Sequence, residues 1–107
     1  MARAPFTRLG LESSMANKLE DQEVQAKLAD LSDWSIENGQ LLKKFSFSSY
    51  GAGVAFAVQV ALLAEKMDHH PDSLEVAWKS VRVAYITHSA GGLTALDFEA
   101  ATRVSKL

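Results

Sequence analysis

The 107-residue sequence contains no cysteine, which excludes disulfides, thiolate nucleophiles and zinc sites built on cysteine ligands. It also lacks an excess of positive charge. The formal net charge is −2, so no basic surface argues for binding to nucleic acid. The longest apolar run, residues 52–64, is shorter than the roughly 18–20 residues of a membrane span and is interrupted by Gln59. We therefore expect a cytoplasmic protein without a membrane or nucleic-acid partner.

The composition that remains is that of one globular domain. Hydrophobic residues make up 48% of the chain and charged residues 22%, a balance that favours a folded core over disorder. Residues 1–18 show no clear period, and we expect them to be a flexible N-terminal extension. Met15 begins a plausible native start, so the residues before it are either an upstream extension or a non-native addition. Residues 19–107 are then the single domain.

The first half of the domain predicts a helix and a hairpin. Apolar residues recur at helical spacing over residues 19–31. Residues 34–36 and 41–47 alternate as strands around Asn38-Gly39, the strongest short hairpin signal. Lys43 falls on the same face of the second strand as the apolar residues, so its face assignment stays open.

The second half begins with a long helix over residues 50–67, capped by Ser48 or Ser49 and ended with the help of Pro71. This helix is apolar on nearly every side, and a helix of that kind needs a second covering surface. We expect the sheet to supply one surface and a sister subunit the other, which predicts a homo-oligomer.

A second hairpin and a last helix complete the chain. Residues 74–78 and 81–85 alternate around a turn near Lys79, and Thr94 with Asp97 three residues later has capping-box spacing. The order of elements is α-β-β-α-β-β-α. Two hairpins mean antiparallel strands, so the predicted class is α+β: a four-stranded antiparallel sheet with three helices packed on one face.

All three histidines fall in two short polar motifs. His69 and His70 follow the long helix, and His88 follows the second hairpin. If the hairpin turns at Lys79, His88 lies opposite His70 with His69 adjacent, and strand alternation points His88 away from the core. The register could slip by a residue or two without separating them. The sequence therefore predicts a histidine cluster at one end of the hairpin.

Carboxylates and hydroxyls accompany this cluster. Glu65, Asp68, Thr87 and Asp97 are close in the sequence or in the predicted fold. A carboxylate beside an imidazole orients it, and such a site can give and take protons on a bound heterocycle. Two other interpretations stay open at this point. A His-His pair at a helix end is often only a solvated cap, and three histidines could bind zinc, although adjacent side chains rarely chelate one ion.

Taken together, these motifs resemble the pterin-4a-carbinolamine dehydratase family. The resemblance is carried by the run from Glu65 to Pro71, by Thr87-His88, by residues 91–94 and by Asp97, and it extends over about residues 19–106. It implies the same α+β fold, assembly into dimers or tetramers, and a pterin substrate without a metal or any cofactor of the protein's own. It also implies dehydration of 4a-hydroxytetrahydropterin to quinonoid dihydropterin, in the recycling of the tetrahydrobiopterin cofactor of aromatic amino acid hydroxylases.

The resemblance further implies roles for individual residues. The three histidines form the catalytic group, in which His69 and His88 are the general acid/base pair and His70 chiefly holds the pterin. The remaining site residues shape the pocket or support it from the last helix: Glu65, Asp68, Pro71, Thr87, Trp34 and, in support, Asp97. The alternative function is a protein-interaction module or transcriptional coactivator that retains a pterin-like site, because some family members also act as protein partners.

Overall fold

The structure, a computed structural model, describes residues 15–107. Most of the expected flexible extension, residues 1–14, lies outside the described residues. At the end of that expected extension, Lys18 forms an isolated antiparallel bridge with Thr94, and the backbone amide of Leu19 donates to the carbonyl of Leu93. The chain is thus tied to the domain from Lys18 onward.

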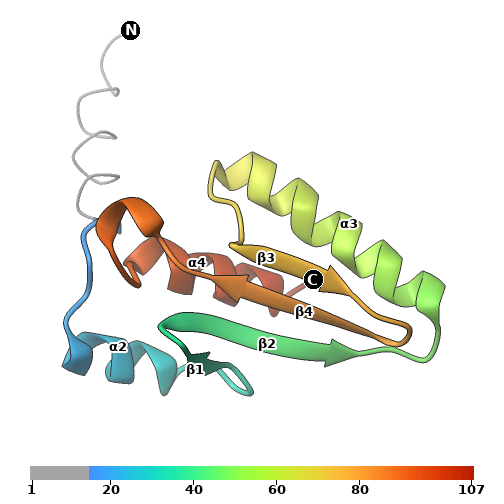
Figure 1. The fold of residues 1–107 in the computed structure, drawn as a ribbon, viewed down its shortest axis with the longest axis horizontal. Helices are drawn as coiled ribbons and strands as arrows, with labels where there is room; N and C mark the ends of the chain where they lie inside the picture. The colour runs from blue at the N-terminus through green and yellow to red at the C-terminus, as the bar shows by residue number, and fades with distance from the viewer. Residues whose placement is uncertain (1–14) are drawn as a thin grey trace, which may run out of the picture.

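The described elements follow the predicted order and class (Figure 1). The four strands form one antiparallel sheet in the order β1-β2-β4-β3, which confirms the α+β prediction. The elements, with one short 3-10 helix labelled η1, are α2 (Asp21–Leu28), β1 (Ser35–Glu37), β2 (Gln40–Ser46), α3 (Tyr50–Met67), β3 (Ser73–Val76), β4 (Ser80–Tyr85), η1 (His88–Ala90) and α4 (Ala95–Val104).

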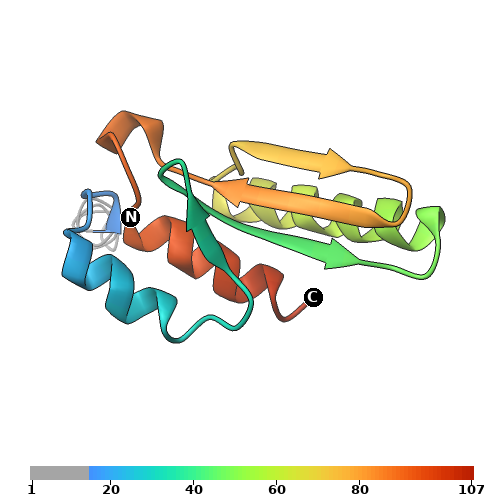
Figure 2. The ribbon, with the colours of Figure 1, turned by 60° about the horizontal axis from the view of Figure 1, so that its bottom comes forward.

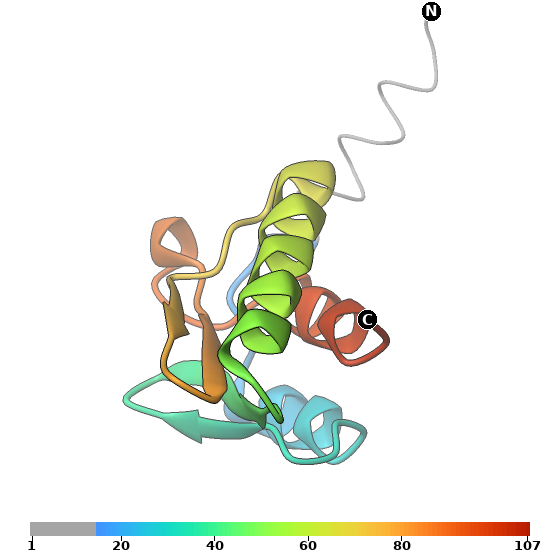
Figure 3. The same cartoon turned by 90° about the vertical axis from the view of Figure 1, so that its right-hand side faces the viewer.

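The helices cover one face of the sheet, as predicted. Figure 2 shows α2 and α4 side by side, and the end view of Figure 3 shows α3 and α4 on the same side of the strands. The core between the two layers contains Val60 from α3, Val83 from β4 and Ala101 from α4, all fully buried. Burial of this apolar surface is the main term that stabilises the domain.

The first hairpin forms as the sequence indicates. Asn38 and Gly39 both take positive φ angles, 52° and 79°, which is the backbone of a type I′ turn. The structure also settles the position of Lys43. Its ammonium lies 4.6 Å from the ring centroid of Phe45, so the aliphatic stem follows the apolar face while the charge rests on an aromatic ring.

The second hairpin departs from the prediction by one residue. Ser73 faces Ala84 and Val76 faces Val81, so the turn is centred between Trp78 and Lys79 rather than on Lys79. The predicted strand over residues 74–78 ends at Val76, and Trp78 is exposed in the turn. The predicted pairing of His88 with His70 is wrong, because β4 ends at Tyr85 and His88 begins η1. The η1 turn ends at Gly91, whose positive φ of 78° is a left-handed backbone that glycine adopts without strain.

The helices match the predictions to different degrees. Helix α3 has the predicted bounds, and Ser49 caps it by accepting from the amide of Ala52 at 3.1 Å. Helix α2 is shorter than the predicted residues 19–31, because Glu20 and Glu23 form its capping box and the chain turns after Leu28. Among the described residues, no helix combines the length and the apolarity needed to cross a bilayer.

Candidate active site

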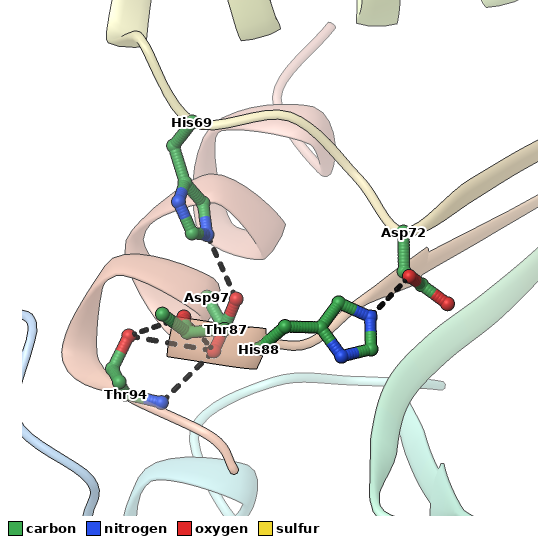
Figure 4. Close-up of polar contacts among 6 residues, drawn as sticks. All are labelled: His69, Asp72, Thr87, His88, Thr94 and Asp97. Carbon is green, nitrogen blue, oxygen red and sulfur yellow. Dashed lines mark hydrogen bonds and ion pairs between the residues drawn. The ribbon is translucent and has the colours of Figure 1, made fainter. Parts of the chain in front are cut away.

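The centre of the site is a pair formed by the largely buried His69 and the fully buried Asp97. The Nε2 atom of His69 lies 2.8 Å from Oδ1 of Asp97 (Figure 4). The carboxylate is fully buried, and the imidazole side chain is 11% exposed. Helix α3 delivers His69 to this position because Asp68 takes a left-handed backbone (φ 53°, ψ 40°) that ends the helix, and the amide of His69 donates back to the carbonyl of Ala64.

The second oxygen of Asp97 is held by threonines. Oδ2 accepts from the Thr87 hydroxyl and from the backbone amide of Thr94, both at 2.9 Å. Thr94 and Asp97 form the predicted capping box of α4. One carboxylate therefore caps a helix, fixes the end of β4 through Thr87 and orients a histidine. A buried carboxylate needs this number of partners, because an unpaired charge in the core is costly.

Tyr85 forms the back wall of the site, and the sequence analysis did not single it out. Its fully buried ring stacks on the imidazole of His69, with centroids 5.9 Å apart and planes at 9°. Burial and the nearby charge of Asp97 raise the pKa of the Tyr85 phenol from 10.0 to about 12. The only signal in the sequence was an aromatic residue on the core face of β4, which is a common core pattern.

His88 has its own carboxylate, which the sequence analysis also missed. Its Nε2 atom lies 2.6 Å from Oδ1 of Asp72, and the imidazole is 74% exposed. The other oxygen of Asp72 accepts from the side-chain amide of Gln40, so β2 helps to hold the pair. Asp72 follows Pro71 in the loop that also carries His69 and His70. The two histidine motifs are therefore brought to one end of the sheet, as predicted, but through Asp72.

His70 pairs with Glu65 at the molecular surface, where both side chains are largely exposed. In all three histidines it is Nε2 that meets a carboxylate. A carboxylate can only accept a hydrogen bond, so Nε2 carries the proton and Nδ1 is left to act toward a ligand. Figure 4 shows His69 and His88 each pointing to its own carboxylate. The site thus offers two oriented imidazoles that come from different loops.

The other predicted site residues lie nearby in different roles. Thr87 is buried against Asp97, Asp68 is the exposed C-cap of α3, and Pro71 is half-buried in the loop before Asp72. Trp34 is not brought to the histidines. It is buried in the core, where its indole N–H donates to the Ser105 hydroxyl at 2.8 Å. Trp34 is linked to the histidines only indirectly, because its ring packs against Tyr85 with ring centroids 6.5 Å apart.

Metal binding was an open alternative for the three histidines. Within residues 15–107, no group of three or more histidine or acidic side chains is arranged to hold an ion. The contacts described above instead divide the histidines among three separate carboxylates.

Comparison with known proteins gives a consistent family assignment. Residues 17–107 match the model of the family described as pterin 4 alpha carbinolamine dehydratase. A Roseiflexus sp. (strain RS-1) protein named "Putative pterin-4-alpha-carbinolamine dehydratase" is similar to this chain, with 40% identity over 87% of this chain and 99% of the relative. The same name belongs to a Mesorhizobium japonicum protein with 43% identity, covering 82% of this chain and 91% of that protein.

Two solved structures resemble the fold. A protein from Brucella melitensis, titled transcriptional coactivator/pterin dehydratase, has a TM-score of 0.79 and 33% identity over 84% of this chain and 97% of that one. A pterin dehydratase-like protein, titled a RuBisCO assembly factor in the alpha-carboxysome, has a TM-score of 0.56 and 25% identity over 68% and 83%. The family match and these relatives confirm the resemblance drawn from the histidine motifs: the chain belongs to the pterin 4 alpha carbinolamine dehydratase family.

Proposed function

We propose that this protein dehydrates 4a-hydroxytetrahydropterin to quinonoid dihydropterin by general acid/base catalysis. The observation that carries the proposal is the pair of oriented imidazoles, His69 on Asp97 and His88 on Asp72, at one end of the sheet. The family assignment supplies the substrate class. In the cell, the reaction would recycle the tetrahydrobiopterin cofactor of an aromatic amino acid hydroxylase in the cytoplasm.

The reaction needs two proton transfers. The bond between C4a and its hydroxyl oxygen breaks and water leaves, so one proton must reach the departing oxygen. A second proton must leave a ring nitrogen as the new double bond forms. Two imidazoles that approach a flat ring from different loops are suited to these opposite tasks. His69 and His88 are the proposed pair, and His70, with Glu65, is proposed to hold the pterin.

The carboxylates prepare the imidazoles for this exchange. Asp97 and Asp72 fix the proton on Nε2 of His69 and His88, which leaves each Nδ1 free to take a proton from the substrate or to return one. The two environments differ, since His69 is 11% exposed and His88 is 74% exposed. His88 can therefore exchange its proton directly with solvent after each turnover, whereas His69 is shielded from water.

The proposal is tested by the turnover of synthetic 4a-hydroxytetrahydropterin above its spontaneous rate. Single substitutions His69→Ala and His88→Ala should each lower kcat by at least about tenfold, within the range that general acid/base groups contribute. His70→Ala should act mainly on KM. Gln59→Ala, on the exposed side of α3, is the matched control and should leave the rate unchanged. Wild-type rates for both histidine variants would contradict the acid/base assignment.

A second candidate is an interaction module that keeps a pterin-like site. The two solved relatives are described as a transcriptional coactivator/pterin dehydratase and as a RuBisCO assembly factor. This chain also exposes two large apolar side chains one turn apart on α3, Val58 and Leu62, with 52% and 64% of their surface accessible.

Affinity purification from the native cell with wild type and a His69→Ala/His70→Ala/His88→Ala variant separates the two candidates. An abundant partner that binds both forms equally would favour the interaction module. A partner lost with the histidines would favour a role that depends on the pterin site.

A further inference from the structure

Tyr85 is a buried polar residue that the proposed proton transfers do not use. It is the last residue of β4, and strand alternation places it on the same core-facing side as Val81 and Val83. Its hydroxyl is the one buried side-chain polar atom among residues 15–107 that has no hydrogen-bond partner. Its ring is the only aromatic ring in that part of the chain found stacked on a histidine. The ring of Tyr85 therefore contacts a site residue, whereas its hydroxyl contacts no polar partner.

The ring supplies a constraint on His69 that Asp97 cannot supply alone. The hydrogen bond from Nε2 to Oδ1 lies in the imidazole plane and fixes one point of the ring. The imidazole can still turn about that bond. A nearly parallel aromatic face, tilted by only 9° at a centroid distance of 5.9 Å, opposes this turn because it fixes the plane itself. The two contacts together determine where Nδ1 points.

Tyr85 is in turn held by the core. Trp34 packs on its ring at 6.5 Å between centroids, and Phe45 forms a T-shaped pair with Trp34 at 6.0 Å between centroids. The Trp34 indole N–H also donates to the Ser105 hydroxyl at 2.8 Å. A ring packed in this way has little freedom to shift. The hydroxyl, by contrast, makes no hydrogen bond within the described residues and cannot orient a neighbour. The positioning effect thus belongs to the ring.

We infer that Tyr85 is a positioning residue of the site, whose ring holds the imidazole of His69 so that Nδ1 faces the substrate. The inference rests on the proposed function for the identity of the substrate. The contact itself has a consequence that requires no turnover. With its plane fixed, the imidazole of His69 should keep one orientation, whereas a ring that turns about its hydrogen bond to Asp97 should populate several orientations.

The experiment compares Tyr85→Phe, which keeps the ring, with Tyr85→Leu, which removes it. NMR relaxation of the ¹³C-labelled ring carbons of His69 reports how far the imidazole moves. Wild type and Tyr85→Phe should show a rigid imidazole, and Tyr85→Leu should show a mobile one. In the dehydration assay, Tyr85→Leu should lower kcat about tenfold with KM within about twofold, because misplaced reacting groups slow the chemical step more than binding. Tyr85→Phe should restore kcat to within about twofold of wild type.

Val83→Ala is the matched control, because it removes buried surface from the same strand face without touching the stack, and it should keep both the rigid imidazole and kcat. If Tyr85→Leu does not fold, Tyr85→Met replaces the ring with a flexible side chain and is read in the same way. An imidazole that stays rigid in the ring-less variants would overturn the inference. A mobile imidazole in those variants, combined with a wild type that shows no turnover, would uphold the positioning contact and refute the proposed dehydration.

Discussion

Burial of the Tyr85 phenol, together with the nearby charge of Asp97, raises its pKa to about 12, against 10.0 in its ordinary state. The unfolded chain therefore loses this proton near pH 10, while the folded protein keeps it until about pH 12. Over that interval the unfolded state binds fewer protons, so the free energy of unfolding falls as the pH rises. The total loss amounts to about 3 kcal/mol for a shift of this size.

Urea unfolding at pH 9 and at pH 11.5 measures this loss. Lysines also titrate in this range, so the comparison is between variants. Tyr85→Phe should lose less stability between the two pH values than wild type, by about 2 kcal/mol. Tyr50→Phe is the control, because Tyr50 is 55% exposed, and it should behave like wild type. Equal losses in the wild type and in Tyr85→Phe would show that burial does not hold the phenol protonated.

Residue by residue, the sequence was informative where a motif was short and polar. His69, His88 and Asp97 could be placed at one site because histidine motifs and a capping box are local patterns. Asp72 and Tyr85 could not, because their roles arise only in three dimensions. Asp72 pairs with His88 only because the fold brings two loops together. Tyr85 has the sequence pattern of an ordinary core residue, and only the fold places its ring on an imidazole.

The first turn of α4 shows how one side chain links an element to the site. Asp97 accepts from Thr94 and Thr87 on one oxygen and meets His69 on the other. In Asp97→Asn, one oxygen becomes an amide that can only donate. That amide must then face either the Thr94 amide, where a hydrogen bond is lost, or Nε2 of His69, where the bond survives only if the imidazole proton moves to Nδ1.

We expect Asp97→Asn to lower the free energy of unfolding by about 1–3 kcal/mol, because strong hydrogen bonds to a carboxylate are replaced by weaker bonds to a neutral amide or by an unpaired buried group. It should also lower kcat, because His69 loses the partner that fixes its tautomer. Urea unfolding and the dehydration assay measure the two effects. Glu99→Gln changes an exposed carboxylate on the same helix, paired with Arg103 at the surface, and should stay within about 0.5 kcal/mol of wild type. A fully stable Asp97→Asn would argue against this hydrogen-bond network.

At the level of elements, the fold was predictable and the exact register was not. Periodicity, the Asn38-Gly39 turn and the Thr94–Asp97 capping box were sufficient for the order of helices and strands. The second hairpin shifted by one residue because no Asn-Gly signal marks its turn, so alternation alone had to fix the centre. The η1 helix was missed because a single turn has too few residues to show a period.

The whole molecule presents one face that the single chain does not cover. Helix α3 buries Phe56 and Val60 against the sheet but leaves Val58 and Leu62 in solvent. Apolar side chains grouped on one helix favour association, because burying them lowers the free energy by roughly 25 cal/mol for each Å² of apolar surface withdrawn from water. This surface is the one on which the expected homo-oligomer would form.

Light scattering on the purified protein measures that assembly directly. Wild type should have the mass of a dimer or tetramer, and Leu62→Glu should reduce it toward the monomer, because a buried carboxylate without a partner opposes association. Gln22→Glu adds the same charge at an already polar, exposed position of α2 and should keep the oligomer. Dehydration should persist in a Leu62→Glu monomer, since His69 and His88 take their carboxylates from the same chain. A monomeric wild type would remove the case for this interface, and loss of activity on dissociation would show that a neighbouring subunit completes the site.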